Sequence, residues 1–400
     1  MPMSDSAPLN LLIIGAGMYV CGRGTSGFGT ILPALGELQR HGYPLGTVNL
    51  AATNPQSIVL ADAQLKRLNK AMGTRLAFGR TYPDRSSGAD PESYRRALAE
   101  MPSPAAAIVV VPDHLHHQVV ADCLSSGLHT LVVKPLTPTV SAARELIRLR
   151  QQHGVYGAVE FHKRYDRANL KIKEILQTGQ IGRPLYFLVE YSQRKSIPAR
   201  TFAGWVDQTN IFQYLGVHYV DIIHFLTGAR PVRAMARGQW GWLKEKGVEV
   251  YDAVHGTIDW LTHGGDHFVS YILTNWVDPE STSAMSDQRI KVIGTRGRCE
   301  SDQKKRGLQL VSDENGIEDI NPDFCATYLD EKARLTYKGY GIKSIHTFIK
   351  DVNAVVQGKV RPEDLESMRP SFESALAATA VVEAVNASLK NGGAWIDIAY

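Results

Sequence analysis

Two short segments carry residue types that could do chemistry together. In the first, an apolar run ends in Gly15-Ala16-Gly17. A glycine turn after a buried strand lets backbone N–H groups approach the pyrophosphate of a dinucleotide. In the second, the apolar run 131–133 ends in Lys134-Pro135. A lysine at the mouth of a neighbouring strand would lie beside a nicotinamide ring, so the two segments predict hydride transfer with Lys134 at the reacting centre.

The position of Lys134 suits a reacting group. Lysine is costly inside a sheet, so it should stand at a strand end or in a cleft. Withdrawn from water beside a positive ring, its charged form would be disfavoured. A pKa lowered to ~7–8 would serve proton transfer. The alternative is a strand-end lysine that extends its ammonium into solvent.

A second set of polar residues shares one helix, predicted over 212–226. Tyr214, His218, Asp221 and Phe225 are spaced four, three and four apart and therefore lie on one helical face. We expect His218 to face a cleft and take a proton, the alternative being a histidine hydrogen-bonded within the core. His224, one turn further on, is expected to be structural.

The glycine turn departs from the usual dinucleotide pattern. Val20 stands where a third glycine is common, and a glycine-rich insert, 21–29, follows before a helix predicted to start at Thr30. Arg23 in this insert could pair with a phosphate or a substrate, or the insert could be a mobile surface loop. A glycine-rich turn without a ligand is the alternative for the whole motif. Met18, next after the turn, is counted among the predicted cofactor contacts.

The end of the second predicted strand bears on the choice of cofactor. An acidic residue there would bind the ribose 2′-OH and favour NAD, but the chain has Thr53-Asn54. No carboxylate at this position would repel a 2′-phosphate, so the sequence slightly favours NADP over NAD.

The segment Pro112 to His117 is expected to lie over the cofactor. Pro112 stops a strand, and His114 and His116 follow it as predicted cofactor contacts. Three histidines this close could bind a metal, but no cysteine or carboxylate cluster completes a site, so none is predicted. Plain helix capping is the other interpretation.

The order of elements explains how these residues could meet. Unbroken apolar runs suit parallel strands covered on both faces. Such runs occur at 10–14, 47–52, 106–111, 130–133 and 155–159. With helices between them, they predict a doubly wound α/β sheet in a dinucleotide-binding domain, residues 1–159. One of these helices is predicted to begin with Asn54 as cap and Pro55 at its first position, and to end at Met72-Gly73.

After residue 160 the pattern changes to strands separated by turns, with few helices. This predicts a second domain, residues 160–400, with a mostly antiparallel sheet and helices on one side. A chain of 400 residues fits two domains.

Composition narrows the class of partner and the compartment. The net charge of +4 comes from 44 basic and 40 acidic residues, which argues against nucleic acid and only weakly for an anionic ligand. Four cysteines without a CxxC pair are expected to be reduced cytoplasmic thiols. No signal peptide or membrane span is expected.

Four segments resemble the glucose–fructose oxidoreductase, inositol dehydrogenase and MocA (Gfo/Idh/MocA) family. The segment 111–116 looks like the family's proline-asparagine-histidine loop. The segment 127–135 is similar to its glutamate-lysine-proline segment, with Val133 in place of the glutamate. The segment 161–166 resembles the start of its crossover helix, and 181–184 the entry to its first C-terminal strand.

The resemblance implies a Rossmann domain joined to an α/β domain whose large open sheet often makes an oligomer interface, as in a dimer or tetramer. It implies that Lys134 and His218 line the reacting centre of an NAD(P)-dependent oxidoreductase acting on a sugar, sugar derivative or cyclitol. Polyol dehydrogenases of the family carry aspartate four residues before the histidine, where this chain has Tyr214. The Tyr214 and Val133 changes suggest a branch with its own substrate.

On this basis His218 would take the hydroxyl proton, Lys134 would stabilise the developing negative charge, and Tyr214 could relay the proton. The candidate partners of substrate hydroxyls are Arg164, Asn210, Gln213 and Asp221. Two alternatives stay open. One is an NAD-dependent glycosidase that oxidises its sugar transiently, and the other is a ligand-sensing regulator that has lost its chemistry.

Overall fold

The computed structural model describes residues 7–314 and 316–400, and the chain forms two compact units. The first unit contains the described residues up to Leu136, then Ala143–His162 and Phe324–Ser374. The second unit contains Thr137–Ala142, Lys163–Asp323 and Ala375–Tyr400.

The first unit is built on a six-stranded parallel sheet with the order β3-β2-β1-β4-β5-β6. Its strands are β1 (Leu9–Ile14), β2 (Leu45–Ala51), β3 (Phe78–Tyr82), β4 (Ala105–Val109), β5 (His129–Val132) and β6 (Gly157–Val159). Strand order reverses beside β1, so the carboxyl ends of β1 and β4 flank the crevice where doubly wound sheets bind ligands. The predicted Rossmann sheet is confirmed.

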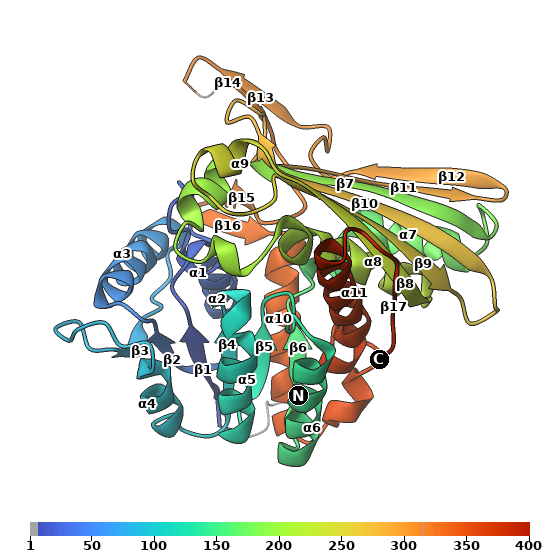
Figure 1. Cartoon of the computed structure of the whole chain (residues 1–400). Helices are drawn as coiled ribbons and strands as arrows, with labels where there is room; N and C mark the ends of the chain where they lie inside the picture. Colours follow the sequence, from blue (N-terminus) through green and yellow to red (C-terminus); the bar gives the residue numbers. More distant parts are fainter. Residues whose placement is uncertain (1–6, 315) are drawn as a thin grey trace. The chain divides into compact units, whose positions relative to one another are not determined.

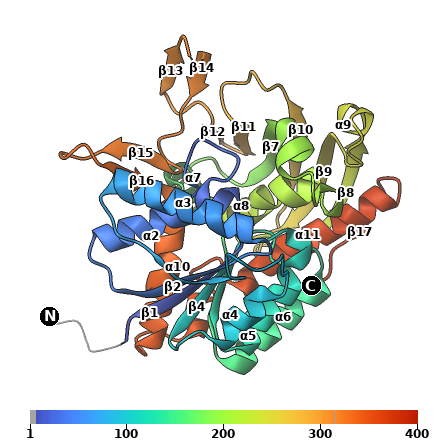
Figure 2. The same ribbon diagram turned by 90° about the vertical axis from the view of Figure 1, so that its left-hand side faces the viewer.

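Helices cover both faces of this sheet, as Figures 1 and 2 show. One face carries α4 (Ser93–Ala99), α5 (His116–Ser125) and α6 (Val140–His153). The other carries α2 (Ile31–Arg40), α3 (Pro55–Met72) and α10 (Tyr340–Val356). The short α1 (Met18–Cys21) contacts α2 and α3. Burial on both faces explains the apolar residues of central strands such as β4. The edge strand β3, in which Gly79 and Arg80 are exposed, has no such run, and the sequence did not predict it.

Local signals fix α3 as the sequence predicts. Asn54 caps the helix, its side-chain oxygen accepting from the Gln56 backbone N–H at 2.9 Å, and Pro55 occupies the first turn. Gly73 ends the helix in the left-handed conformation.

The second unit contains a seven-stranded mixed sheet with the order β12-β11-β7-β10-β9-β8-β17. Only β7 and β10 pair in parallel; the other neighbours are antiparallel. The strands are β7 (Pro184–Arg194), β8 (Arg230–Gln239), β9 (Ala253–Leu261), β10 (His267–Asp278), β11 (Ser286–Gly294), β12 (Gly297–Asp302) and β17 (Ile396–Asp397). The predicted mostly antiparallel sheet is confirmed.

One face of this sheet is covered and the other is open. Inward positions such as Phe187, Val189 and Ile272 are fully buried, whereas Glu190 and Arg289 on the other face are exposed. The helices of the unit are α7 (Arg167–Gln177), α8 (Val217–Thr227), α9 (Trp242–Glu245) and most of α11 (Phe372–Lys390). A small hairpin joins β13 (Gln309–Ser312) to β14 (Gly316–Asp319).

The chain returns to the first unit near its end, which differs from a simple division at residue 160. Residues Phe324–Ser374 belong to the first unit. They include the hairpin of β15 (Ala326–Leu329) and β16 (Leu335–Lys338), followed by α10. The physical reason is that buried α10 side chains such as Ile345, Phe348 and Val352 share one apolar core with α2.

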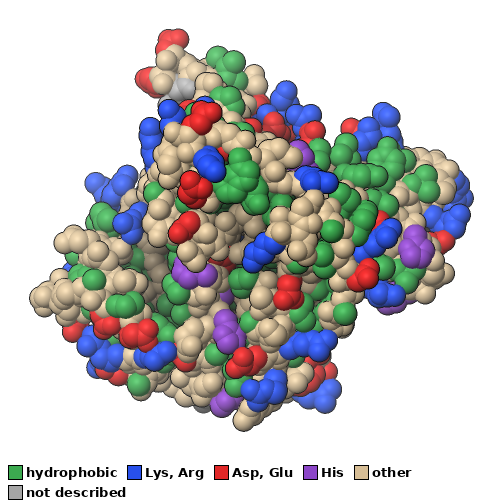
Figure 3. All heavy atoms as spheres, viewed as in Figure 1, with side chains coloured by type: hydrophobic (Ala, Val, Ile, Leu, Met, Phe, Trp, Pro, Cys, Tyr) green, Lys and Arg blue, Asp and Glu red, His purple; other side chains and the backbone are tan. Residues whose placement is uncertain are grey.

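Charged side chains are spread over the face seen in Figure 3, with basic and acidic groups interspersed. Within residues 7–314 and 316–400, no helix combines the length and apolar character needed to cross a bilayer.

Candidate functional site

The glycine turn after β1 is shaped by two glycines with different constraints. Gly15 has a φ of +111°, and a Cβ there would lie 2.0 Å from the carbonyl oxygen of Val110. Only glycine fits that position. A Cβ at Gly17 would meet nothing within 4 Å. The backbone at Gly17 therefore faces open space, as the close approach of a dinucleotide requires.

The predicted insert and the predicted helix start at Thr30 are confirmed, but the single helical turn before the insert was not predicted. Helix α1 is a single turn that ends at Gly22 in the left-handed conformation, and α2 starts at Ile31 with Thr30 as its cap. Between them the insert closes on itself. A Cβ at Gly22 would lie 2.1 Å from the Gly27 carbonyl oxygen, and one at Gly29 would lie 2.7 Å from that of Met18.

Arg23 connects this insert to α3. Its Nη1 donates a hydrogen bond to the Ser57 hydroxyl at 2.9 Å. Arg67, further along α3, lies 5.4 Å from the centre of the Phe28 ring in the same insert. The insert is therefore held against α3 by two arginines.

Thr53 and Asn54 are exposed at the carboxyl end of β2. The Thr53 carbonyl accepts from the Asp90 N–H at 2.8 Å, while the Asn54 side chain is occupied in capping α3. Asn54 thus has a structural task beside its predicted contact with cofactor.

His116 joins the loops that follow β4 and β5. Its ring is fully buried, with Nδ1 2.7 Å from the Pro135 carbonyl oxygen and Nε2 3.0 Å from that of Val111. Burial lowers the pKa of His116, and the Asp113 carboxylate opposes this shift. Through its ring His116 positions the chain next to Lys134 rather than facing open space. His114 is exposed.

Lys134 stands just beyond β5 in a partly buried position. Burial lowers the pKa of its ammonium to about 7, while the carboxylates of Asp113 and Glu160 act in the opposite direction. A lysine with this pKa carries its extra proton about half the time near neutral pH. Its amino group can therefore both donate a hydrogen bond to a substrate oxygen and take part in proton transfer.

Sequence reasoning missed the two carboxylates beside Lys134. Asp113 opens the 3-10 turn after β4, and Glu160 follows β6, so both lie at the carboxyl ends of strands of the same sheet. Glu160 is buried, accepts from the Ser344 hydroxyl and lies 2.6 Å from His162 Nδ1. The rule that parallel strands end at one edge could have identified both.

In the second unit, the predicted helix around His218 begins with a π-helical turn. Residues Phe212–Gly216 form this turn, and α8 starts at Val217. The prediction of one regular helix over 212–226 is wrong in its first turn. Single π-turns inside helices are frequent at functional sites.

Tyr214 and His218 have a common neighbour, Tyr191 on β7. The Tyr191 ring centre lies 6.4 Å from that of His218. Burial raises the pKa of Tyr191, and the Tyr214 hydroxyl raises it further. Tyr214 is half-buried among aromatic rings, the nearest being Phe202 at 4.9 Å between centres. Tyr191 is therefore a further candidate, which its apolar strand context concealed.

Two predicted substrate contacts are paired with each other. Arg164 donates to Asp221 through Nε at 2.9 Å and Nη2 at 2.5 Å, and both residues are buried. This forked ion pair satisfies both charges within the fold. Asp221 shares the helical face of His218 as predicted, but its carboxylate is engaged by Arg164.

The two predicted amide contacts meet a third amide on α11. Asn210 Nδ2 donates to Asn386 Oδ1 at 2.7 Å, and Asn386 Nδ2 donates to Gln213 Oε1 at 2.8 Å. The Asn210 side-chain oxygen also accepts from the backbone N–H groups of Phe212 and Gln213. These amides fix the start of the π-turn that carries Tyr214.

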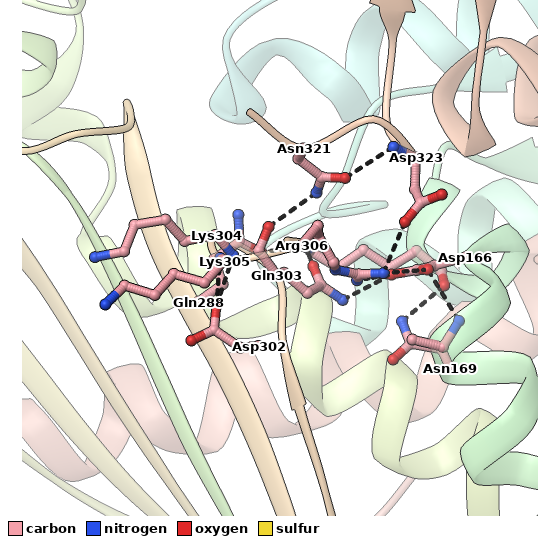
Figure 4. A network of polar contacts seen from close by, with 12 residues as sticks. Asp166, Asn169, Gln288, Asp302, Gln303, Lys304, Lys305, Arg306, Asn321 and Asp323 are labelled. Atoms are coloured by element: carbon pink, nitrogen blue, oxygen red, sulfur yellow. Dashed lines mark hydrogen bonds and ion pairs between the residues drawn. The ribbon is translucent and has the colours of Figure 1, made fainter. Parts of the chain in front are cut away.

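A buried polar network lies in the second unit, and Figure 4 shows its members Asp166, Gln288, Gln303 and Arg306. The Lys163 ammonium is buried, donates to Gln288 and to Gln303 at 2.7 Å, and lies 5.2 Å from the centre of the Tyr191 ring. Gln303 donates in turn to Asp166, which also accepts from Arg306 at 2.7 Å. The network holds the segment after β12 against the start of α7.

A hollow of about 270 Å³ lies on the sheet of the second unit and is lined by residues of β7, β9, β10 and β11. Tyr191 is one of them, but no site residue predicted from the sequence lines it. In the part of the chain that the structure describes, no group of three or more His, Cys, Asp or Glu side chains could hold a metal ion.

Comparison with known proteins gives two family matches. Residues 45–161 match the family described as "Oxidoreductase family, NAD-binding Rossmann fold". Residues 169–300 match the "GFO/IDH/MocA C-terminal domain".

Several characterised proteins are similar to this chain. A scyllo-inositol 2-dehydrogenase (NAD(+)) of Bacillus subtilis is 26% identical over 57% of this chain and 64% of its own length. A myo-inositol 2-dehydrogenase of Thermotoga maritima is 24% identical over 76% of this chain and 83% of its own. For several other curated relatives the chain spans between 50% and 64% of the relative's length.

Solved structures share the fold over almost the whole chain. The crystal structure of scyllo-inositol dehydrogenase from Lactobacillus casei, with NAD(H) and scyllo-inositol bound, covers 98% of this chain and 100% of its own. The TM-score is 0.66 at 15% sequence identity.

Proposed function

This chain belongs to the Gfo/Idh/MocA family of oxidoreductases, and we propose that it transfers a hydride between a nicotinamide dinucleotide and a ring hydroxyl or ketone of a sugar, sugar derivative or cyclitol. The observation that carries the proposal is Lys134. It stands at the carboxyl edge of a Rossmann sheet, and burial lowers its pKa to about 7. Strongly shifted pKa values cluster at functional sites, and this supports a role for Lys134 in the reaction.

The residues of the first unit fit a dinucleotide. Gly17 leaves room above its backbone, so the turn could hold a pyrophosphate. Thr53 and Asn54 would lie towards the ribose, and Pro112 and His114 towards the nicotinamide. When bound, the nicotinamide ring supplies the hydride-accepting carbon.

We assign the remaining chemistry to side chains of this chain. In the oxidation direction His218 accepts the proton of the substrate hydroxyl. Lys134 donates a hydrogen bond to the same oxygen and stabilises its developing negative charge. Tyr214 relays the proton or positions the substrate. Tyr191, whose ring lies beside that of His218, keeps the Tyr214 and His218 side chains in place.

The class of substrate is supported by the relatives. Two of those described above are named inositol dehydrogenases, which favours a cyclitol or a related polyol. The mutual pairing of Arg164 with Asp221 removes both from the set of direct substrate contacts that we propose.

A substrate panel with a lysine variant tests the proposal. Sugars, aminosugars and cyclitols would be assayed by nicotinamide absorbance with NAD and with NADP. For the substrate so found, Lys134→Met should lower turnover by ~10²–10⁴-fold. Lys70→Met, which removes an exposed lysine from α3, is the matched control and should leave turnover unchanged.

Two results would contradict the proposal. Turnover of Lys134→Met within about tenfold of wild type would remove Lys134 from the reacting centre. Product formed on a bound cofactor without accumulation of reduced nicotinamide would instead identify the transient oxidation of a glycosidase.

A further inference from the structure

The glycine-rich insert after α1 places one charged group at a defined point on the next helix. The guanidinium of Arg23 leaves the insert and donates to the hydroxyl of Ser57, in the first turn of α3. The insert is closely packed near its two ends, because Gly22 and Gly29 leave no room for a side chain, whereas Gly24, next to Arg23, has open space around it. The hydrogen bond to Ser57 is therefore what directs the Arg23 guanidinium to α3.

The position of Ser57 identifies what Arg23 is near. Helix α3 begins directly after the carboxyl end of β2, with Asn54 as its cap and Ser57 three residues further on. In a dinucleotide-binding sheet, the end of this strand lies beside the adenosine ribose rather than the pyrophosphate. Arg23 thus reaches the ribose end of the site from the glycine-loop side.

The charges at this point favour an anion. Thr53 is neutral where an acidic residue would select a ribose 2′-OH. Among the described residues, no carboxylate forms an ion pair with Arg23, and its guanidinium has five N–H donors, one of which is used by Ser57. A planar guanidinium fork matches two phosphate oxygens.

We propose that Arg23 and Ser57 together bind the 2′-phosphate of NADP, so that NADP is the preferred carrier of this protein. The inference rests on the proposed function and makes it more specific. Ser57 aims the guanidinium and offers a hydroxyl donor, while Arg23 supplies the positive charge. The insert, which interrupts the usual glycine pattern, is then the element that sets cofactor preference.

Binding measured without catalysis tests this assignment. Titration calorimetry of the full-length protein would compare NADPH, NADH and the fragment 2′,5′-ADP. Wild type should bind NADPH more tightly than NADH. Arg23→Gln should weaken binding of NADPH and 2′,5′-ADP by about 10–100-fold, the value of a charge-assisted hydrogen bond, with NADH within about threefold. Arg23→Lys should recover part of the loss, and Ser57→Ala should lose less than Arg23→Gln.

Lys70→Gln is the matched control, because it removes an exposed positive charge from a later turn of α3. It should leave the ratio of the two affinities unchanged. Equal loss of NADPH and NADH in Arg23→Gln, or no loss of either, would overturn the Arg23 assignment while leaving the dinucleotide site intact. A folded wild type that binds neither dinucleotide would overturn the proposed function, and the assignment with it.

Discussion

At Lys134, two opposing effects act on one ammonium group. Removal from water favours the neutral amine, and the carboxylates of Asp113 and Glu160 favour the charged form. Removal from water dominates, since the pKa is lowered from 10.5 to about 7. The result is a group that changes protonation near neutral pH without a histidine.

This shift makes stability depend on pH in a defined direction. Between pH values of about 7 and 10 the unfolded chain still binds a proton that native Lys134 has released. The free energy of unfolding of wild type, relative to Lys134→Met, should therefore rise as pH increases through this range. Urea denaturation of both proteins at a series of pH values measures it. A difference that stays constant would show that Lys134 has an ordinary pKa.

The Arg164–Asp221 pair offers a second test at the scale of single residues. Arg164→Met would leave the Asp221 carboxylate buried without its guanidinium, which should lower the free energy of unfolding by about 3–5 kcal/mol. The double variant Arg164→Met/Asp221→Leu should recover most of that loss. Urea denaturation of wild type and the two variants measures both changes in the free energy of unfolding. Unchanged stability of Arg164→Met together with a raised KM would return Arg164 to substrate binding.

At the scale of the element, the two glycines of the turn have different tasks: Gly15 is needed for stability and Gly17 for binding. Gly15→Ala should lower the free energy of unfolding by about 2–6 kcal/mol, because it adds backbone strain and a clash with the Val110 carbonyl. Gly17→Ala meets no atom of the protein and should change stability by about 1 kcal/mol or less.

Gly17→Ala should nevertheless weaken dinucleotide binding, because its methyl group would occupy the space that the turn leaves open. Thermal denaturation and calorimetric titration of the same two variants check both statements. Normal affinity in a stable Gly17→Ala protein would place the dinucleotide away from this turn.

Elements with strong local signals could be predicted from the sequence, and irregular ones could not. The cap, first-turn proline and terminal glycine of α3 are short-range features, and the structure confirms them. Hydrophobic periodicity does not show where a helix ends after one turn, as at α1, or where it widens into a π-turn, as at Phe212–Gly216. Both interruptions lie beside predicted site residues.

At the scale of the whole molecule, the first unit is completed by a distant part of the chain. Five apolar side chains of α10 lie in its core, namely Ile342, Ile345, Phe348, Ile349 and Val352. Each is worth about 1.5–3 kcal/mol when buried, so together they match the net stability of a typical domain, about 5–15 kcal/mol.

A fragment that ends at His162 should therefore fail to unfold cooperatively. The same fragment with residues 324–374 joined to it should show a cooperative thermal transition by circular dichroism. Cooperative unfolding of the shorter fragment would show that α10 is dispensable for this core.

Long-range pairing also marks the limit of sequence reasoning about the site. Lys134 and Gly15 could be found because strand ends of a parallel sheet meet at one edge. The partners Asn386 and Asp221 could not, because nothing local shows that Asn386 meets Asn210 or that Asp221 meets Arg164. An amphipathic helix such as α10 likewise shows which of its faces is buried, but not which core it joins.

The imidazole of His116 has a consequence for anyone who redesigns this protein. One ring touches the loops after two different strands, and the second of those loops carries Lys134. If only one of the two loops were replaced, the His116 ring would still contact the unchanged loop, but its contact with the new loop would not be preserved. Transplants of substrate preference between relatives should therefore move both loops as a single cassette.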